Sequence, residues 1–303
     1  MNEFFKELNN KSNNKICFLD NINKYKNNEI NLKLNVKRWE NDKVFLFDSG
    51  YATFRIKNYG DNIKLLNDNV DIFINNIKYK CKNYFYPTKD GIYDVKLKFK
   101  ININDCFGLF HHCFDIINID LSSFNWNNVT NLCAMFLGYT NLESINFSNF
   151  NTKIVTDMSY IFKECYNLKK IELSSFNTKK VTDMRLMFSE CISLEHLNLS
   201  SFNTENVNDI NGMFSYCGKL KNLKLFSFDI KRGTEMSTLF GGSPNISEID
   251  LSSFESGDIY QFLDYHFLKN LVSLKIKNKL YIKIKNENPT FFDNFKNLQI
   301  ITV

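Results

Sequence analysis

Few residues of this 303-residue sequence combine the types and spacing that chemistry requires. The run His111-His112-Cys113, with Cys106 nearby, supplies nitrogen and sulfur atoms of the kind that bind zinc. Its spacing matches no established zinc-ligand pattern, and Cys113 falls at a repeated position typical of a core. The sequence has no Gly-rich phosphate loop, no G-x-S-x-G turn and no H-E-x-x-H motif. We therefore predict no enzyme activity, no metal site and no cofactor.

The cysteines offer a second chemistry, which is disulfide formation. One repeated position holds, in succession, Cys113, Tyr139, Cys165, Cys191, Cys217 and Ser243. Stacked repeat units would bring such residues to about 5 Å from one another, within disulfide range. Side chains of in-register neighbours point the same way, however, and free Cys is a common small residue of protein cores. We expect a reduced cysteine ladder in the core.

A repeat of 26 residues positions these side chains. Apolar, strand-like segments start at Ile119, Ile145, Ile171, Leu197, Leu223 and Ile249. The L-x-x-I-x-L alternation of each unit predicts a short strand, and the Ser-Ser-Phe-Asn that follows predicts a turn whose Phe points inward. The next segment places Met158, Ile161 and Phe162 at i, i+3 and i+4, which predicts a short helix with an N-cap at Thr156. One strand and one helix cannot bury their apolar faces alone, so the units must stack into a solenoid.

These rows resemble the BspA-type leucine-rich repeats of bacterial and protist surface proteins. The clearest row, residues 194–207, reads LEHLNLSSFNTENV, and the family unit resembles LxxLDLSSFNTSNV. The resemblance covers residues 101–303. It implies a leucine-rich-repeat solenoid with a role in adhesion or protein binding.

The predicted fold is an α/β repeat solenoid of the leucine-rich-repeat class, with one short strand and one short helix per 26-residue unit. About eight units occupy residues 101–303. Residues 29–100 are predicted to form a small, mostly-β N-terminal cap domain, because turn signals separate strand-like segments at Ile30–Trp39, Lys43–Phe47, Tyr51–Lys57, Asp71–Lys80 and Ile92–Ile101. Residues 1–28, rich in Asn and Lys, are predicted to be a polar tail or a short helix.

The net charge of +5 is concentrated in residues 1–100, which contain 19 Lys and Arg against 12 Asp and Glu. The lysines there alternate with apolar residues, as in Lys96-Leu97-Lys98-Phe99-Lys100. That alternation is typical of the solvated face of a strand, so we expect no nucleic-acid partner. A signal peptide, a lipidation motif and an apolar run long enough to span a membrane are missing from the sequence. The expected location is the cytoplasm, or the cell surface if the family role holds through another export route.

The candidate partner-binding residues are the outward positions of the predicted strands: Asp120, Asn146, Glu172, Asn198, Lys224, Phe226, Asp250 and Lys275. They favour a non-enzymatic scaffold for protein–protein interaction or adhesion, which binds its partner on the exposed sheet face. A cytoplasmic adaptor or effector that uses the same face is the alternative. A third interpretation, that these are simply solvated strand positions, stays open. The strand-like segment Ile301–Val303 has no polar cap after it and predicts weak self-association through its edge.

Overall fold

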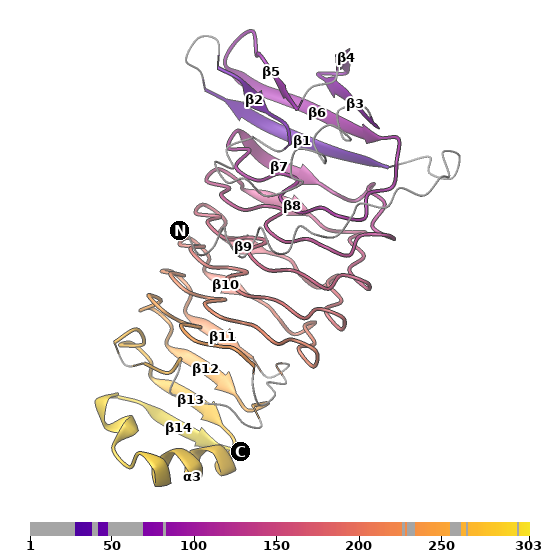
Figure 1. Cartoon of the computed structure of the whole chain (residues 1–303). Coiled ribbons are helices and arrows are strands. Elements are labelled where there is room, and N and C mark those ends of the chain that lie inside the picture. The colour runs from indigo at the N-terminus through magenta and orange to yellow at the C-terminus, as the bar shows by residue number, and fades with distance from the viewer. Residues whose placement is uncertain are drawn as a thin grey trace.

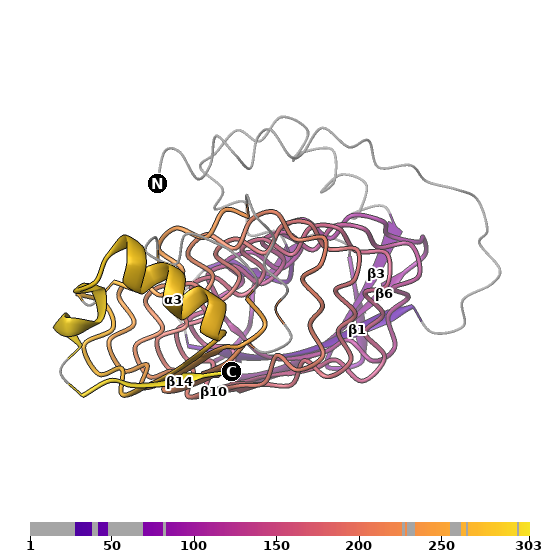
Figure 2. The same cartoon turned by 90° about the horizontal axis from the view of Figure 1, so that it is seen from below.

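The structure is a computed structural model in which the chain forms an elongated solenoid (Figure 1). It describes residues 28–37, 42–47, 69–80, 83–225, 228, 234–254, 262–264, 266–295 and 297–303. Successive coils contribute one short strand each to a parallel column along one side of the solenoid (Figures 1 and 2). These strands are β7 (Ile116–Asp120), β8 (Ser144–Asn146), β9 (Lys170–Ile171), β10 (His196–Leu197), β11 (Asn222–Lys224), β12 (Glu248–Leu251), β13 (Ser273–Ile276) and β14 (Gln299–Thr302). The repeat solenoid predicted from the 26-residue period is confirmed.

A second hydrogen-bonded column joins the coils about half a coil away from the strands. Single-residue parallel bridges connect Asp105, Asn131, Asp157, Asp183, Asp209 and Glu235 in that order. Backbone bonds flank each bridge: the N–H of Thr156 donates to the Thr130 carbonyl at 2.8 Å, and that of Met158 donates to the Asp183 carbonyl at 3.0 Å. Both sides of the coils are therefore held at the spacing of a β-ladder, about 4.8 Å.

The prediction of one short helix per unit is wrong. Residues 130–138 and their equivalents form tight turns in which two positions per coil have left-handed backbone angles, such as Tyr160 (φ 61°) and Glu164 (φ 62°). Left-handed residues interrupt an α-helix. The backbone between them bonds to the next coil instead, as where the Phe162 N–H donates to the Met187 carbonyl at 3.0 Å.

The spacing between coils explains this outcome. An α-helix with its side chains is about 10 Å across, roughly twice the distance between coils that are hydrogen-bonded on both sides. A helix in every unit would require the coils to fan apart on that side, and the bridge column prevents this. Met158, Ile161 and Phe162 are nevertheless fully buried, because tight turns satisfy the same i, i+3, i+4 spacing. The chain is a β-solenoid and not an α/β leucine-rich repeat.

Ladders of identical side chains fill the core. Phe136, Phe162, Phe188 and Phe214 stack in one ladder with ring centroids 5.6 to 6.0 Å apart and interplanar angles of 15° or less. A second ladder contains the Phe of each Ser-Ser-Phe turn, and it packs Phe176 against Phe202 at 6.2 Å. The predicted Phe and Met core positions are confirmed, since all of these residues are buried.

The cysteine ladder also lies in the core with free thiols. Cys113, Cys165, Cys191 and Cys217 are buried and unbonded to one another. The Sγ of Cys191 lies 3.1 Å from the Phe162 carbonyl, to which it donates, and Ser243 repeats this bond from its Oγ to the Phe214 carbonyl at 2.7 Å. The Ser243 hydroxyl therefore takes over the hydrogen bond that the thiol makes in the other coils.

Asparagine and aspartate form the corners of each coil. In the best-formed rows three side-chain oxygens accept the N–H two residues later, as in Asn146 to Ser148, Asn151 to Lys153 and Asp157 to Ser159, at 2.9 to 3.2 Å. Other Asn side chains donate to the preceding coil, as Asn149 does to the Ser122 carbonyl at 2.8 Å. These side chains supply hydrogen bonds to backbone groups in the turns and between the coils, which would otherwise be buried without a partner. The abundance of Asn is thus largely architectural in the repeats.

Antiparallel strands cover the first coil. The sheet order is β4-β3-β6-β1-β7-β8, with β1 (Glu29–Val36) paired to β7 and the remaining strands at β3 (Val70–Ile74), β4 (Ile77–Tyr79) and β6 (Gly91–Phe99). The short strands β2 (Val44–Phe45) and β5 (Tyr84–Phe85) form a separate pair. The predicted segments Tyr51–Lys57 and residues 1–27 lie outside the described residues. The first sheet of the solenoid is therefore continuous with the N-terminal strands.

The described C-terminal coil contains the one α-helix of the described residues, α3 (Asn278–Glu287), followed by the 3-10 turn η2 (Phe291–Asn294). Figure 2 shows α3 on the side of the solenoid opposite β14. Its buried face consists of Leu280 and Ile284. This last coil is not flanked by a further bridge column among the described residues, so a helix fits there.

Candidate functional site

The predicted partner-binding residues form a single column on the strand face. The pairing register places Asp120 beside Asn146, and Asp250 between Lys224 and Lys275. Glu172 and Asn198 occupy the equivalent positions directly after β9 and β10. Phe226 lies outside the described residues. The structure thus brings seven of the eight predicted residues into one row, with about 5 Å between neighbours.

Four members of this column have a structural task. The side-chain oxygens of Asp120, Asn146, Asn198 and Asp250 each accept the N–H two residues later, at 2.9 to 3.1 Å. Asn146 also donates to Asp120 at 2.9 Å, and Lys275 pairs with Asp250 at 3.3 Å. Burial acts to raise the pKa of Asp250, but hydrogen bonds from Ser252 and Lys275 outweigh it and lower that pKa.

Glu172 and Lys224 differ from the other column residues. Both are exposed, and neither side chain has an ion pair or hydrogen bond within the described part of the chain. They are therefore the members of the column whose charge is available to a partner.

A groove adjoins the column where the chain enters the strands, and we call it the strand-face groove. Its volume is about 830 Å³. Residues of five adjacent layers line it: Asn35 and Lys37 at the end of β1, Asp115 and Ile117 at β7, Asn141 and Glu143 before β8, Asn167, Lys169 and Lys170 at β9, and Glu195 and His196 at β10. Sequence reasoning missed this groove. The signal was present, because the repeat position 117, 143, 169 and 195 changes from Ile to Glu, Lys and Glu while the apolar skeleton around it stays fixed.

The groove carries charges of both signs. Its lining contains the lysines Lys37, Lys169 and Lys170 and the acidic residues Asp115, Glu143 and Glu195. Among the described residues, Glu195 is the groove residue that forms an ion pair. Its partner is Lys219 at 4.0 Å, and both side chains are at least half exposed. Such a pair contributes little. Burial, followed by repulsion from Asp42, raises the pKa of Asp115 to about 6.

The lysines of the N-terminal sheet provide a contrast. Lys96 and Lys98 both pair with Glu29, at 3.3 and 3.5 Å. Lys100 and Lys78 pair with Asp71 at 2.9 and 3.2 Å, and the Lys100 hydrogen bond is the main cause that lowers the pKa of Asp71. The basic alternation in the sequence is therefore a solvated strand face with internal charge partners, as predicted. Within the described ranges, the charges of the strand-face groove have no comparable partners.

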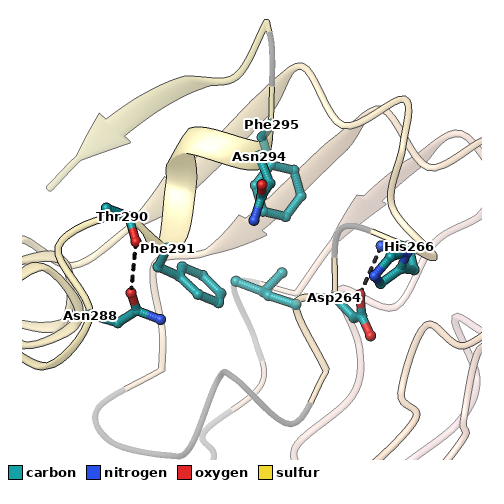
Figure 3. Close-up of a pocket in the computed structure, with 8 residues that line it drawn as sticks. Asp264, His266, Asn288, Thr290, Phe291, Asn294 and Phe295 are labelled. Carbon is teal, nitrogen blue, oxygen red and sulfur yellow. Dashed lines mark hydrogen bonds between the residues drawn. The ribbon is translucent and has the colours of Figure 1, made fainter.

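A smaller pocket of about 370 Å³ lies near the C-terminal end, between η2 and the residues Leu263, Asp264 and His266 (Figure 3). The rings of Phe291 and Phe295 contribute to its wall. Two polar contacts at its rim are internal: the His266 N–H donates to Asp264 at 2.8 Å, and the Thr290 hydroxyl donates to Asn288 at 3.3 Å. These bonds stabilise turns, so the pocket offers weaker grounds for binding than the groove.

The histidine pair that suggested zinc lies in the first coil. His111 is buried, and burial followed by repulsion from His112 lowers its pKa to about 3. The His112 ring packs edge-on against His111 and Phe114, with centroids 4.0 and 5.2 Å apart, and covers Gly138. In the described part of the chain, no three His, Cys, Asp or Glu side chains are grouped as metal ligands. The pair therefore packs the corner of the coil.

Comparison with known families finds a sequence family that matches the repeats, and the description of that family gives no activity. The sequence model of the family described as "Mycoplasma protein of unknown function, DUF285" matches residues 104–222 and, in an overlapping second match, residues 140–254. This is a family of BspA-like repeats, so the resemblance of the rows is supported at that level. Neither a curated protein nor a solved structure matches the chain. No helix in the described ranges is long and apolar enough to cross a membrane.

Proposed function

We propose that this chain is a non-enzymatic scaffold for protein–protein interaction or adhesion that binds a protein partner on its strand face. The observation that carries the proposal is the strand-face groove together with the adjoining charges of Glu172 and Lys224. Their side chains lack partners among the described residues, whereas the lysines of the N-terminal sheet are matched by Glu29 and Asp71. Charges kept unmatched on a rigid surface favour selective association.

A stacked β-solenoid supports this use physically. Its backbone bonds run from coil to coil on two sides, so side chains on the strand face project from a rigid support. A substitution at an exposed strand position changes the surface without disturbing the Phe and Cys ladders. The same surface would serve an extracellular adhesin or a cytoplasmic adaptor. Protease treatment of intact cells distinguishes the two, because it digests only protein displayed outside.

The test is affinity capture with charge-exchanged variants. The double variant Glu172→Lys/Lys224→Glu keeps the net charge and alters two exposed side chains. We expect it to lose, by about tenfold or more, a partner that the unaltered chain captures. The matched control is Lys179→Glu/Glu205→Lys, two exposed residues at the neighbouring corner of the coils, which should retain the partner. Equal capture by both variants would contradict the proposal, as would a turnover activity that one point mutation abolishes.

A further inference from the structure

We propose that the strand-face groove binds an extended, charge-patterned peptide segment of the partner, about six residues long and aligned with the solenoid axis. This inference rests on the proposed function and specifies the chemistry of the partner. It is derived from the length of the groove, the order of its charges and the composition of its lining.

The length follows from the layers that line the groove. The lining residues come from β1, β7, β8, β9 and β10, which are successive layers of the solenoid. Asn35 of β1 lies directly beside the first coil, since its N–H donates to the Asp115 carbonyl at 2.8 Å. Four steps of about 4.8 Å give a groove about 19 Å long, and an extended chain rises about 3.3 Å per residue. About six peptide residues therefore span it.

The charges change sign along this length. The layers present Lys37, then Asp115, then Glu143, then the neighbouring pair Lys169 and Lys170, and finally Glu195 beside His196. None of these side chains forms an ion pair with another member of the groove among the described residues. A peptide that places acidic residues opposite the Lys169–Lys170 pair and basic residues opposite Asp115 and Glu143 would match the three central layers. The opposite arrangement would place like charges together.

The lining favours a peptide over other ligands. Nucleic acid requires a continuous basic stripe, whereas the acidic residues Asp115, Glu143 and Glu195 interrupt this groove. Bases and sugar rings stack on aromatic side chains, and the described residues of the lining include no Phe, Tyr or Trp. Carboxylates, ammonium groups and amides are instead the groups that pair with the side chains and backbone of an extended polypeptide.

The experiment uses the full chain and three fluorescent synthetic octapeptides. One has two Glu opposite the lysine pair and two Lys on the side of Asp115 and Glu143, the second has these signs exchanged, and the third has Gln at all four positions. Fluorescence anisotropy at low and physiological salt measures their Kd values. We expect the complementary peptide to bind about tenfold more tightly than the exchanged one, with the difference shrinking as salt rises.

The double variant Lys169→Glu/Lys170→Glu should reverse the preference between the two charged peptides. The matched control is Lys179→Glu/Lys180→Glu, a second exposed lysine pair in the same coil but outside the groove, and it should keep the original preference. Equal affinity for all three peptides, or the same loss in both variants, would overturn the inference. If either result is obtained while Glu172→Lys/Lys224→Glu still loses the captured partner, the proposed function stands and only the inference of a peptide-binding groove is overturned.

Discussion

The variant Asp105→Asn should stabilise the chain at neutral pH. Asp105 begins the bridge column, and its Oδ1 accepts the Phe107 N–H at 2.8 Å. The next coil has Asn131 at this position, and the Oδ1 of Asn131 accepts the Cys133 N–H at 2.9 Å. An amide therefore keeps the turn while it removes a charge that is costly to bury.

The magnitude follows from the pKa of Asp105. Burial raises it from 3.8 to about 6, although hydrogen bonds from Phe107 and Asn131 act against this. At 1.36 kcal/mol per pKa unit, the folded state at pH 7 carries a penalty of about 3 kcal/mol. The carboxyl is protonated in both states below pH 3.8, so no penalty exists there. It develops as the pH rises from 3.8 through about 6 and is constant above that.

The assay is urea unfolding at pH 4, 5, 6 and 7, followed by intrinsic tryptophan fluorescence, to which Trp126 contributes. Trp126 is buried in the next coil, where its ring lies 4.5 Å from that of Phe124 and 4.3 Å from that of Phe150. The gain from Asp105→Asn should grow from a few tenths of a kcal/mol near pH 4 to about 3 kcal/mol at pH 7. The counterpart Asn131→Asp should destabilise, because it inserts a carboxylate between Asp105 and Asp157. A gain that does not vary with pH, or a loss at pH 7, would refute the reasoning.

Three further predictions concern packing and association. Gly138→Ala should destabilise the fold by about 1–3 kcal/mol, because the φ of Gly138 is +79° and an added Cβ would lie 2.7 Å from the His112 ring. The control is Gly218→Ala, whose Cβ would meet nothing nearer than 3.8 Å. Equal melting temperatures of the two variants would contradict the prediction. The six described cysteines should resist alkylation until the chain unfolds, since burial raises thiol pKa values, to about 12 for Cys217; mass-spectrometric mapping of label on native protein at those six positions would disprove this. Weak self-association through β14 should be visible by light scattering and be reduced by Ile301→Lys, because Ile301 is 40% exposed on a strand that pairs with β13 alone among the described strands; strictly monomeric behaviour at high concentration would rule it out.

The candidate site was only partly predictable. The alternation in each row placed Glu172 and Lys224 outward, and the structure leaves both exposed. The groove could not be derived in the same way, because one wall comes from Asn35 and Lys37 and depends on β1 pairing with β7 across about 80 residues of sequence. Nor does the sequence reveal that Asp120 and Asn146 are engaged in turns, since an exposed strand position and an Asx turn use the same residue types.

The sequence by itself determined the period, the stacked coils and the residues that fill them. Any compact arrangement must bury Phe162 and Phe188 at one point of each coil and Cys165 and Cys191 at another, so a repeat of 26 residues is enough to predict the ladders. Tertiary structure alone decided whether the backbone after each strand bonds within itself or to the next coil. A helix and a run of tight turns bury Met158, Ile161 and Phe162 equally well. The inter-coil bonds on both sides hold the coils too close together for a helix in every unit.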